Sequence, residues 1–463
     1  MPQQLPEMLD RYAHRNTARF HMPGHKGRGM GGFFSRELAN WDITELSFSD
    51  DLQNPSASIQ KAQELYAARY GAKHTFFLVN GSTAGLLALL LSLPRGANVL
   101  IGRDCHRAVI SGIALAGHRC SFLSPAVNTE HSLHGSICAD ALREALSREH
   151  FDAVCITSPN YYGLCADLSA LYAATRAHGT LLFVDAAHGA HFPFSQLLPD
   201  TPSGCADAWV NSAHKTLNAL GQSALLHIGP NMDLAAVQRA LSMVQTSSPS
   251  YLLLASLDWA RYTADLAGAW SKAVQACTAL REELSTVLGI VVPGKEIVGT
   301  AGIADIDFTR LTLDVHARGI TGFAAQRLLE AQNVFVEMAD YQRLVCICTP
   351  SDDPAWYPML HRALEKLPYG MPHKKCAAVV YPAAPRDLPL HEAARAAAIS
   401  VPLTGAAGRI AAECAGVYPP GIPLVTPGER ITQECIDFLL EEQACGASLF
   451  GVHDGNVAVV SHK

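Results

Sequence analysis

The stretch WVNSAHKT, residues 209–216, places a single lysine, Lys215, between a short apolar run and the apolar segment 224–228. A lysine at such a position can be buried, and burial lowers the pKa of an amine because desolvation disfavours the ammonium form. A neutral amine can form a Schiff base with a carbonyl compound. Considered alone, Lys215 fits a surface loop better, since most lysines are exposed.

Two upstream segments favour a buried site for this lysine. TLLFVD, residues 180–185, is typical of a buried parallel strand with a carboxylate, Asp185, at its C-terminal end. NGSTAG, residues 80–85, predicts a small-residue turn that opens an apolar helix, whose first N–H groups can bind a phosphate. A Schiff-base lysine, an acidic partner for a pyridine nitrogen and a phosphate-binding turn are the three anchors that pyridoxal phosphate needs.

Apolar strands and helical segments alternate between residues 75 and 228, as in a parallel sheet with helical crossovers. Seven strands are predicted, at residues 75–79, 98–102, 119–123, 153–158, 181–185, 208–210 and 224–228. Ligands of such sheets collect at the C-terminal strand ends. The polar residues that fall there are Ser82, Thr83, His106, Asp185, His188 and Lys215. We therefore predict an α/β fold with a large, mostly parallel seven-stranded sheet.

The rest of the chain is predicted to add an arm and a second domain. FHMPGHKGRG, residues 20–29, is Gly-rich and cationic and indicates an N-terminal arm over residues 1–30. A helical pattern from residue 251 to about 288, with Gly268 as its only glycine before the end, predicts a long helix that joins two domains. Shorter strands and helices then alternate. The large domain accordingly spans residues 31–290, and a smaller α+β C-terminal domain spans residues 291–463.

Composition limits the class of protein. The chain has 463 residues, which is too long for one ordinary core. Its net charge of -7 and lack of basic runs argue against a nucleic-acid partner. No apolar run is long enough to span a bilayer and no signal peptide is evident, so we expect a cytoplasmic protein without a membrane partner. Thirteen cysteines without a C-x-x-C pair indicate reduced thiols.

Two further patterns have more than one interpretation. Asp185, His188 and His191 follow the spacing D-x-x-H-x-x-H, which can supply three metal ligands. No fourth ligand or catalytic carboxylate stands at motif spacing elsewhere, so we expect no metal. His106 either starts a helix or stacks on a flat cofactor. The acidic segment 42–51 precedes Asn54 and Pro55, which predict a helix start, and is either a solvated loop or a binding site for a cation.

Taken together, these segments resemble the pyridoxal-phosphate-dependent ornithine/lysine/arginine decarboxylases of the aspartate aminotransferase fold, in particular the compact members without an N-terminal wing domain. The resemblance rests on FHMPGHK at 20–26, DDL at 50–52, NGST at 80–83, DAAHG at 185–189, SAHK at 212–215, residues 246–258, YPPGIP at 418–423 and PGE at 427–429. It implies a basic amino acid as substrate, carbon dioxide and a polyamine precursor as products, and a homodimer or higher homo-oligomer. In such a dimer, the turn 246–250 and the arm 20–26 would approach the partner's cofactor.

The resemblance also implies roles for individual residues. Lys215 would form the link to the cofactor and Asp185 would pair with its pyridinium nitrogen. Around them, Ser82, Thr83, Ser212 and His214 would hold the phosphate, His106 would stack on the ring, and His188 would lie near the ring's oxygen. Lys215 and His106 are both candidates for returning the proton to Cα. Arginine is favoured as substrate because a guanidinium needs bidentate acceptors, which Glu45, Asp50 and Asp51 can supply.

Two alternatives stay open at this stage. An aminotransferase or an aldolase-type lyase can use the same fold, and an aminotransferase would hold the substrate carboxylate with an arginine from the small domain. Arg386, Arg395 and Arg409 are candidates for that arginine. The second alternative, an inactive regulatory homologue, is less consistent with the presence of all three cofactor anchors.

Overall fold

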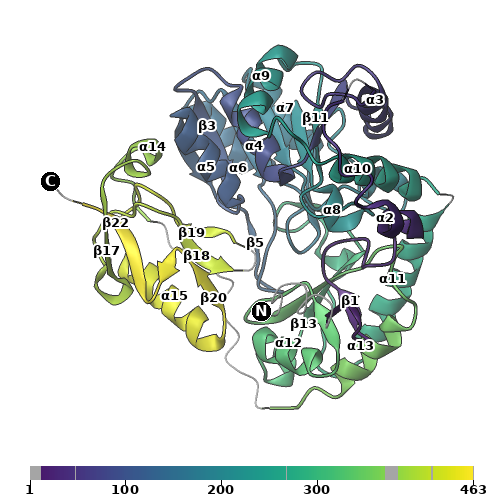
Figure 1. Cartoon of the computed structure of the whole chain (residues 1–463). Helices are drawn as coiled ribbons and strands as arrows, with labels where there is room; N and C mark the ends of the chain where they lie inside the picture. Colours follow the sequence, from purple (N-terminus) through teal and green to yellow (C-terminus); the bar gives the residue numbers. More distant parts are fainter. Residues whose placement is uncertain (1–11, 47, 267, 371–383, 419–420, 462–463) are drawn as a thin grey trace, which may run out of the picture.

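The computed structural model describes residues 12–461, apart from residues 47, 267, 371–383 and 419–420. A seven-stranded sheet in the order β2-β11-β10-β9-β7-β3-β4 forms the centre of the large domain (Figure 1). Its strands are β2 (His74–Leu78), β3 (Asn98–Gly102), β4 (Arg119–Leu123), β7 (Ala153–Thr157), β9 (Leu181–Asp185), β10 (Ala208–Asn211) and β11 (Ala224–Ile228). Only β11 runs antiparallel to its neighbours. The predicted α/β fold with a mostly parallel seven-stranded sheet is confirmed.

Helices cover both faces of this sheet. One face carries α4 (Gly81–Leu91), α5 (Arg107–Ala116) and α9 (Leu234–Val244). The other carries α3 (Ser58–Tyr70), α6 (Ala139–Arg148), α7 (Leu168–Ala177) and α10 (Tyr251–Ala264). Successive strand residues point to opposite faces, so Phe77 lies in one hydrophobic core while Phe76 and Leu78 lie in the other. This double burial explains why the strands are apolar throughout.

The single long helix predicted from residue 251 is wrong, because the structure divides it in two. Helix α10 ends at Ala264, and α11 (Ala269–Ser285) begins after Gly268. Gly268 has a φ of 73°, in the left-handed region that a Cβ disfavours and that interrupts a right-handed helix. The glycine within the pattern marked this break.

The helix start predicted at Asn54 and Pro55 is also wrong. Helix α3 begins at Ser58, and the carboxylate that serves its first turn is that of Asp50. Its oxygens accept hydrogen bonds from the backbone N–H groups of Ala57 and Ile59, at 2.9 and 2.8 Å. The helix N-terminus is therefore capped from a loop eight residues upstream, which a search for adjacent capping residues does not find.

A second group of elements follows the large domain. Strands β13 (Arg310–Asp314), β16 (Arg343–Ile347) and β15 (Met338–Ala339) form an antiparallel sheet, with α12 (Gly322–Glu330) and α13 (Trp356–Glu365) in the same hydrophobic core. The arm joins this group, because β1 (Ala18–Phe20) pairs in parallel with β14 (Val334–Val336). Lys26 in the arm is buried and donates to the carbonyl oxygens of His21 and Ile347.

The C-terminal elements form a separate lobe, drawn in yellow in Figure 1. One sheet contains β17 (Ala398–Pro402), β22 (Asn456–Val460) and β21 (Val452–His453), and the other β19 (Pro423–Val425), β18 (Ala415–Tyr418) and β20 (Ser448–Phe450). With α15 (Gln433–Cys445), they build a hydrophobic core of their own. The described part of residues 291–463 thus contributes to more than one hydrophobic core, and the domain boundaries after residues 30 and 290 stay predictions.

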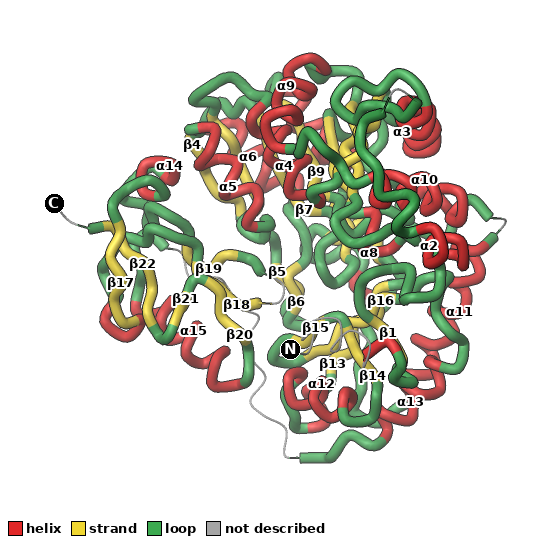
Figure 2. Tube along the Cα trace, viewed as in Figure 1, coloured by secondary structure: helices red, strands yellow, loops and turns green. Residues whose placement is uncertain are grey.

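Short elements complete the chain, as Figure 2 shows. They are α2 (Gly31–Glu37), α8 (Ala213–Thr216), α14 (Leu390–Ala393), the strand pair β5 (Val127–Asn128) and β6 (Leu133–His134), and the pair β8 (Leu164–Ala166) and β12 (Ile303–Ile306). Among the helices within the described residues, none combines the length and the apolar composition needed to cross a membrane.

Candidate active site

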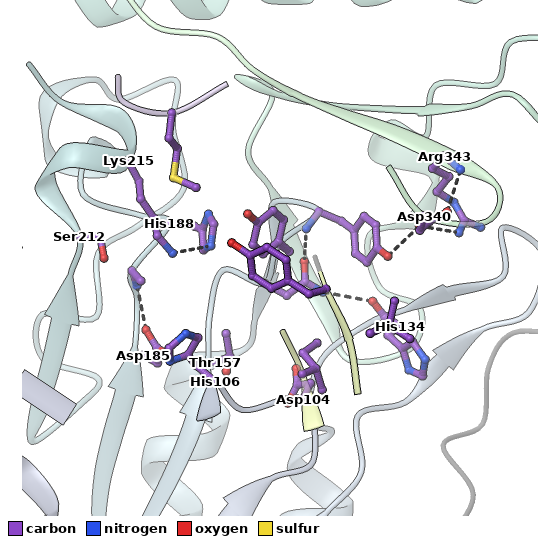
Figure 3. A pocket seen from close by; sticks show the side chains of 18 of the residues that line it. Asp104, His106, His134, Thr157, Asp185, His188, Ser212, Lys215, Asp340 and Arg343 are labelled. Carbon is purple, nitrogen blue, oxygen red and sulfur yellow. Dashed lines mark hydrogen bonds and ion pairs between the residues drawn. The ribbon is translucent and has the colours of Figure 1, made fainter. Parts of the chain in front are cut away.

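A pocket of about 400 Å³ lies at the C-terminal edge of the seven-stranded sheet (Figure 3). The large domain contributes Lys215 and Asp185, the second group of elements contributes Asp340, and the C-terminal lobe contributes Glu442. The pocket therefore lies where three parts of the chain meet. Met22 of the arm also lines it, so the arm reaches the pocket of its own chain.

Lys215 lies in the short helix α8, directly after the end of β10. Its Nζ is 3.0 Å from Nε2 of His188. Burial lowers the pKa of the Lys215 amine, while the negative charge of Asp185 opposes this shift. The buried site thus makes the neutral, nucleophilic form of the amine more accessible than it is in water, in the direction that the sequence led us to expect.

Two carboxyl groups, those of Asp185 and Asp104, lie at the C-terminal ends of strands β9 and β3, which flank β7 in the sheet. Asp185 is the last residue of β9, is 4% exposed, and accepts a hydrogen bond from the N–H of Ala187 at 3.2 Å. Asp104, which sequence reasoning missed, follows β3, and burial together with the charge of Asp185 raises its pKa to about 7. Asp104 Oδ1 and Thr157 Oγ1 are buried in the pocket wall without a partner in the described part of the chain. A polar ligand in this pocket would satisfy both atoms.

The turn before α4 is arranged to receive an anion. No side chain caps the first turn of this helix, and Ser82 and Thr83 of that turn line the pocket. The N–H of Gly81 donates to the carbonyl oxygen of Gln222, and the next N–H groups of an uncapped helix start can bind an anion. Ser212 Oγ donates to Ser82 Oγ at 2.9 Å, which brings the two predicted phosphate-binding segments together. The adjacent His214 donates its Nδ1 proton to the carbonyl oxygen of Ser223, and burial lowers its pKa to about 4.

His106 combines the two interpretations that its position allowed. Its Nδ1 accepts a hydrogen bond from the N–H of Ala108 at 3.2 Å, so the side chain caps α5. The same ring lines the pocket, and burial lowers its pKa. Capping fixes the orientation of the ring, and stacking on a cofactor stays a prediction for it.

These groups together fit pyridoxal phosphate. An uncapped helix start can hold the phosphate, Asp185 can pair with a protonated ring nitrogen, and the Lys215 amine can add to the aldehyde carbon. Every residue predicted for cofactor binding lines this one pocket: Ser82, Thr83, His106, Asp185, His188, Ser212, His214 and Lys215.

The residues predicted for substrate binding are placed elsewhere. Asp50 is buried, and its oxygens are occupied by backbone N–H groups that outweigh the effect of burial and lower its pKa. Glu45 is exposed, and neither it nor Asp51 lines the pocket of this chain. The Asp50 carboxylate already serves the helix. Substrate binding by Glu45, Asp50 and Asp51 stays a prediction that gains no support from this chain's pocket.

The arginines considered for an aminotransferase-type clamp are also outside the pocket. Arg386 donates to Thr426 Oγ1 and lies 3.6 Å from a carboxylate oxygen of Glu429. Arg395 donates to the carbonyl oxygen of Leu115, and Arg409 is absent from the pocket wall. The arginine that does line the pocket, Arg343, is held by Asp340 and Asp314.

The end of the pocket opposite Lys215 contains acidic side chains beside the guanidinium of Arg343, and sequence reasoning missed them (Figure 3). Asp340 accepts hydrogen bonds from Tyr162 Oη at 2.8 Å and from the N–H groups of Gln342 and Arg343. The side chain of Glu442, on α15, makes no hydrogen bond or ion pair with the described residues, and its backbone carbonyl accepts from the N–H of Ala447. Burial, followed by the charges of Asp340 and Glu441, raises its pKa to about 7. No local signal identified Glu442, since its helix is one amphipathic segment among many.

The D-x-x-H-x-x-H pattern does not converge on one point. His191 Nε2 lies 3.1 Å from Asp307 Oδ2, and both side chains are almost fully buried. His188 is instead turned toward Lys215. Across the described residues, no group of three or more His, Cys, Asp or Glu side chains is arranged to hold a metal ion.

Comparisons with known proteins agree with this geometry. The family model of the Orn/Lys/Arg decarboxylase major domain matches residues 4–355, and that of the Orn/Lys/Arg decarboxylase C-terminal domain matches residues 375–454. An arginine decarboxylase of Bacillus anthracis is 32% identical over 464 residues, covering 96% of this chain and 94% of that protein. An arginine decarboxylase of Bacillus subtilis is 32% identical over 470 residues, covering 98% and 96%.

Solved structures show the same fold. Lysine decarboxylase A from Pseudomonas aeruginosa has a TM-score of 0.78 at 20% identity, and the similarity covers 100% of this chain and 80% of that one. An alanine–glyoxylate aminotransferase from Nostoc has a TM-score of 0.59 at 16% identity, covering 76% and 96%. The family match, which spans most of the sequence, decides between these two chemistries. The chain belongs to the Orn/Lys/Arg decarboxylase family and is a pyridoxal-phosphate-dependent amino acid decarboxylase.

Proposed function

We propose that this enzyme removes the α-carboxylate of arginine as carbon dioxide. The observation that carries the proposal is the pocket itself. Lys215 lies at one end and Asp340 at the other (Figure 3), and the carboxyl group of Glu442 also lines the pocket and is close enough to Asp340 for their charges to interact. Arginine has an α-amino group at one end and a guanidinium at the other, so its two ends match the two ends of the pocket. The two Bacillus relatives named as arginine decarboxylases support the same choice.

At the cofactor end, we assign the chemistry to residues of the large domain. Pyridoxal phosphate, when bound, supplies an electron sink for the electron pair that carbon dioxide leaves at Cα. Asp185 favours the protonated ring nitrogen because its carboxylate lies in a buried site. Ser82, Thr83, Ser212 and His214 would hold the phosphate, and His106 would cover the ring. Lys215 and His106 remain the two candidates for returning a proton to Cα.

At the other end, Glu442 is the group that we assign to the guanidinium. A neutral carboxyl in this environment gains a partner and ionises when a cation approaches, because opposite charge lowers the pKa of an acid. Asp340 already accepts four hydrogen bonds, one of them from the guanidinium of Arg343, so we assign it a structural role rather than direct binding of the substrate. An ionised Glu442 can accept two parallel hydrogen bonds from a guanidinium.

The direct test is a side-by-side measurement of carbon dioxide release from arginine, lysine and ornithine. We expect arginine to have the highest kcat/KM, since the shorter cations of lysine and ornithine reach Glu442 less completely. Citrulline, which replaces the guanidinium with a neutral urea group, is the matched control and should be a poor substrate. A higher kcat/KM for lysine or ornithine would reject arginine as substrate while leaving the decarboxylase chemistry intact.

We also propose that the enzyme is a cytoplasmic homodimer that supplies a polyamine precursor, and that its sites are shared between subunits. Phe48 is 78% exposed and Leu46 is 46% exposed, and the nearby Gln53 contacts the turn 246–250. Exposed apolar side chains of this size favour a covering partner. Mixing Lys215→Ala subunits with subunits inactivated in the turn 246–250 should restore some activity, and failure after verified subunit exchange would reject shared sites.

A further inference from the structure

Arg310 is a buried cation that lies behind the pocket. It is the first residue of β13, is 1% exposed, and does not line the pocket. Its Nη2 lies 3.0 Å from Nδ1 of His188. His188 in turn contacts Nζ of Lys215 through its other ring nitrogen, at 3.0 Å (Figure 3). The three side chains therefore form one continuous chain of hydrogen bonds.

The direction of each hydrogen bond follows from the chemistry of the guanidinium. A guanidinium carries only donors, so His188 Nδ1 must accept the hydrogen bond from Arg310. A neutral imidazole with an unprotonated Nδ1 carries its proton on Nε2. His188 is held neutral because burial, together with the positive charge of Arg310, places its pKa well below the ordinary value. Its Nε2–H can then only donate to Lys215.

An ammonium group cannot accept that hydrogen bond, because it has no lone pair. Lys215 must present the lone pair of a neutral amine to the Nε2–H of His188. We propose that Arg310 is a positioning residue that fixes His188 in the Nε2-protonated tautomer, so that Lys215 is held as a neutral amine ready to capture the cofactor. This inference rests on the assignment of Lys215 as the cofactor lysine and is independent of the substrate.

Other charged and titratable groups surround this chain. Asp185 and Glu337 favour the ammonium form of Lys215, while Arg310 also disfavours it directly through its positive charge. His106 and His214 face His188 and are themselves disfavoured as cations by burial. The direct charge effect of Arg310 and its effect through His188 act in the same direction, so an experiment must separate them.

Arg310 has partners that account for its burial. Burial opposes the ionisation of Asp307, but His191 and then Arg310 outweigh it and lower the pKa of Asp307 to about 2. The side chain of Arg310 also packs against Gly163, where an added Cβ would lie 2.7 Å from its Cβ. Its Nε and Nη1 have no hydrogen-bond partner among the described residues. The hydrogen bond from Nη2 to His188 is therefore the one that the guanidinium makes within this part of the chain.

The first experiment measures the capture of pyridoxal phosphate by the cofactor-free chain, followed through the visible absorbance of the bound cofactor at different pH values. In Arg310→Met, His188 is free to take the other tautomer and accept from an ammonium group. The pH midpoint of the capture rate should therefore rise by about one unit or more. Arg310→Lys, which keeps a cationic donor, should recover part of this shift. Arg318→Met, which removes another buried arginine of the same region, should leave the midpoint unchanged.

A double-mutant cycle separates the two effects of Arg310. In a His188→Phe background, the ring is kept but both nitrogens are lost, so Arg310→Met should shift the midpoint by less than half as much. An equal shift in both backgrounds would show a direct charge effect and overturn the proposal. Lys215→Ala should capture no cofactor through a covalent link, and capture by that variant would overturn the assignment on which the proposal rests.

The second experiment reads the tautomer in the chain that keeps both Arg310 and His188. Nitrogen-15 NMR of the cofactor-free chain with labelled histidine, with His188 assigned by its loss in His188→Phe, reports the protonation of each ring nitrogen. We expect a protonated Nε2 and an unprotonated Nδ1. The opposite tautomer or an imidazolium would overturn the proposal. Neither measurement uses an amino acid substrate, so their outcome is distinct from that of the arginine assay.

Discussion

At one end of the pocket, Lys215, Asp185 and His106 all follow strands of the seven-stranded sheet, whereas at the other end Asp340 and Glu442 come from two later parts of the chain. The first end contains groups that can hold the cofactor, and the second contains groups that can meet a cation. A single rigid sheet holds the first set, while the second depends on how separate hydrophobic cores pack. Reaction type and substrate choice are thus supported by different parts of the fold.

The largest expected effect is at the cofactor end. Lys215→Ala should lower kcat by about 10⁴-fold or more, because no other lysine among the described residues lines the pocket to form the covalent link. The visible absorbance of the bound cofactor should also change. The matched control is Lys272→Ala, a lysine on α11 away from the pocket, which should keep full activity. Near wild-type turnover in Lys215→Ala would show that the end of the pocket around Lys215 is not the cofactor end.

The next effect tests the buried acid of the same end. Asp185→Asn should lower kcat by about 10²- to 10³-fold, because an amide stabilises a protonated ring nitrogen less well than a carboxylate does. Cofactor binding should persist in part, since the phosphate and lysine contacts remain. The measurement is steady-state kinetics combined with cofactor titration. An unchanged kcat would transfer this role to the neighbouring Asp104, whose pKa is raised to about 7.

Substitutions at the substrate end should change KM rather than kcat. Glu442→Gln should raise the KM for arginine by about 10- to 30-fold with little change in kcat, because the guanidinium loses a partly buried anionic partner. Glu441→Gln, on the exposed side of the same helix, is the matched control and should change KM much less. If both variants bind arginine as tightly as the wild type, the acidic end is not the substrate end.

Because Glu442 must ionise to bind a cation, we also expect the KM for arginine to depend on pH. Burial raises the pKa of Glu442 to about 7, so below this pH the group is protonated and must lose its proton to bind a cation. The KM for arginine should therefore fall as the pH rises from about 6 to 8 and then level off. Glu442→Gln should remove this dependence. A pH dependence of the same size in the variant would assign it to another group.

The smallest expected effect concerns the acidic segment outside the pocket. Asp50→Ala should destabilise the protein by about 1 to 3 kcal/mol, because backbone N–H groups of α3 lose their acceptor, and should leave the KM for arginine unchanged. Since these hydrogen bonds lower the pKa of Asp50 in the folded state, the stabilisation is present above the ordinary aspartate pKa and is lost as the pH falls through the lowered value. Urea unfolding with Asp50→Asn as the milder control measures the effect. A raised KM without loss of stability would return Asp50 to substrate binding.

The sequence predicted the sheet closely and the helix boundaries less well. The seven predicted strands each lie within one residue of the observed bounds, since an apolar run between turn residues is a local signal. The interruption at Gly268 and the cap from Asp50 were missed. The cap depends on a loop that folds back onto the helix, and periodicity within the helix does not report where such a loop lies.

Sequence patterns alone determined that Ser82, Thr83, His106, Asp185, His188 and Lys215 would meet, because the C-terminal ends of parallel strands share one edge of the sheet, and the family resemblance added Ser212 and His214. Only the tertiary structure decided that Glu442 faces this edge from α15 and that Arg310 lies against His188. Those contacts join residues more than 100 positions apart through the packing of separate cores. Many weak nonlocal contacts set such packing, and none of them leaves a periodic or adjacent pattern in the chain.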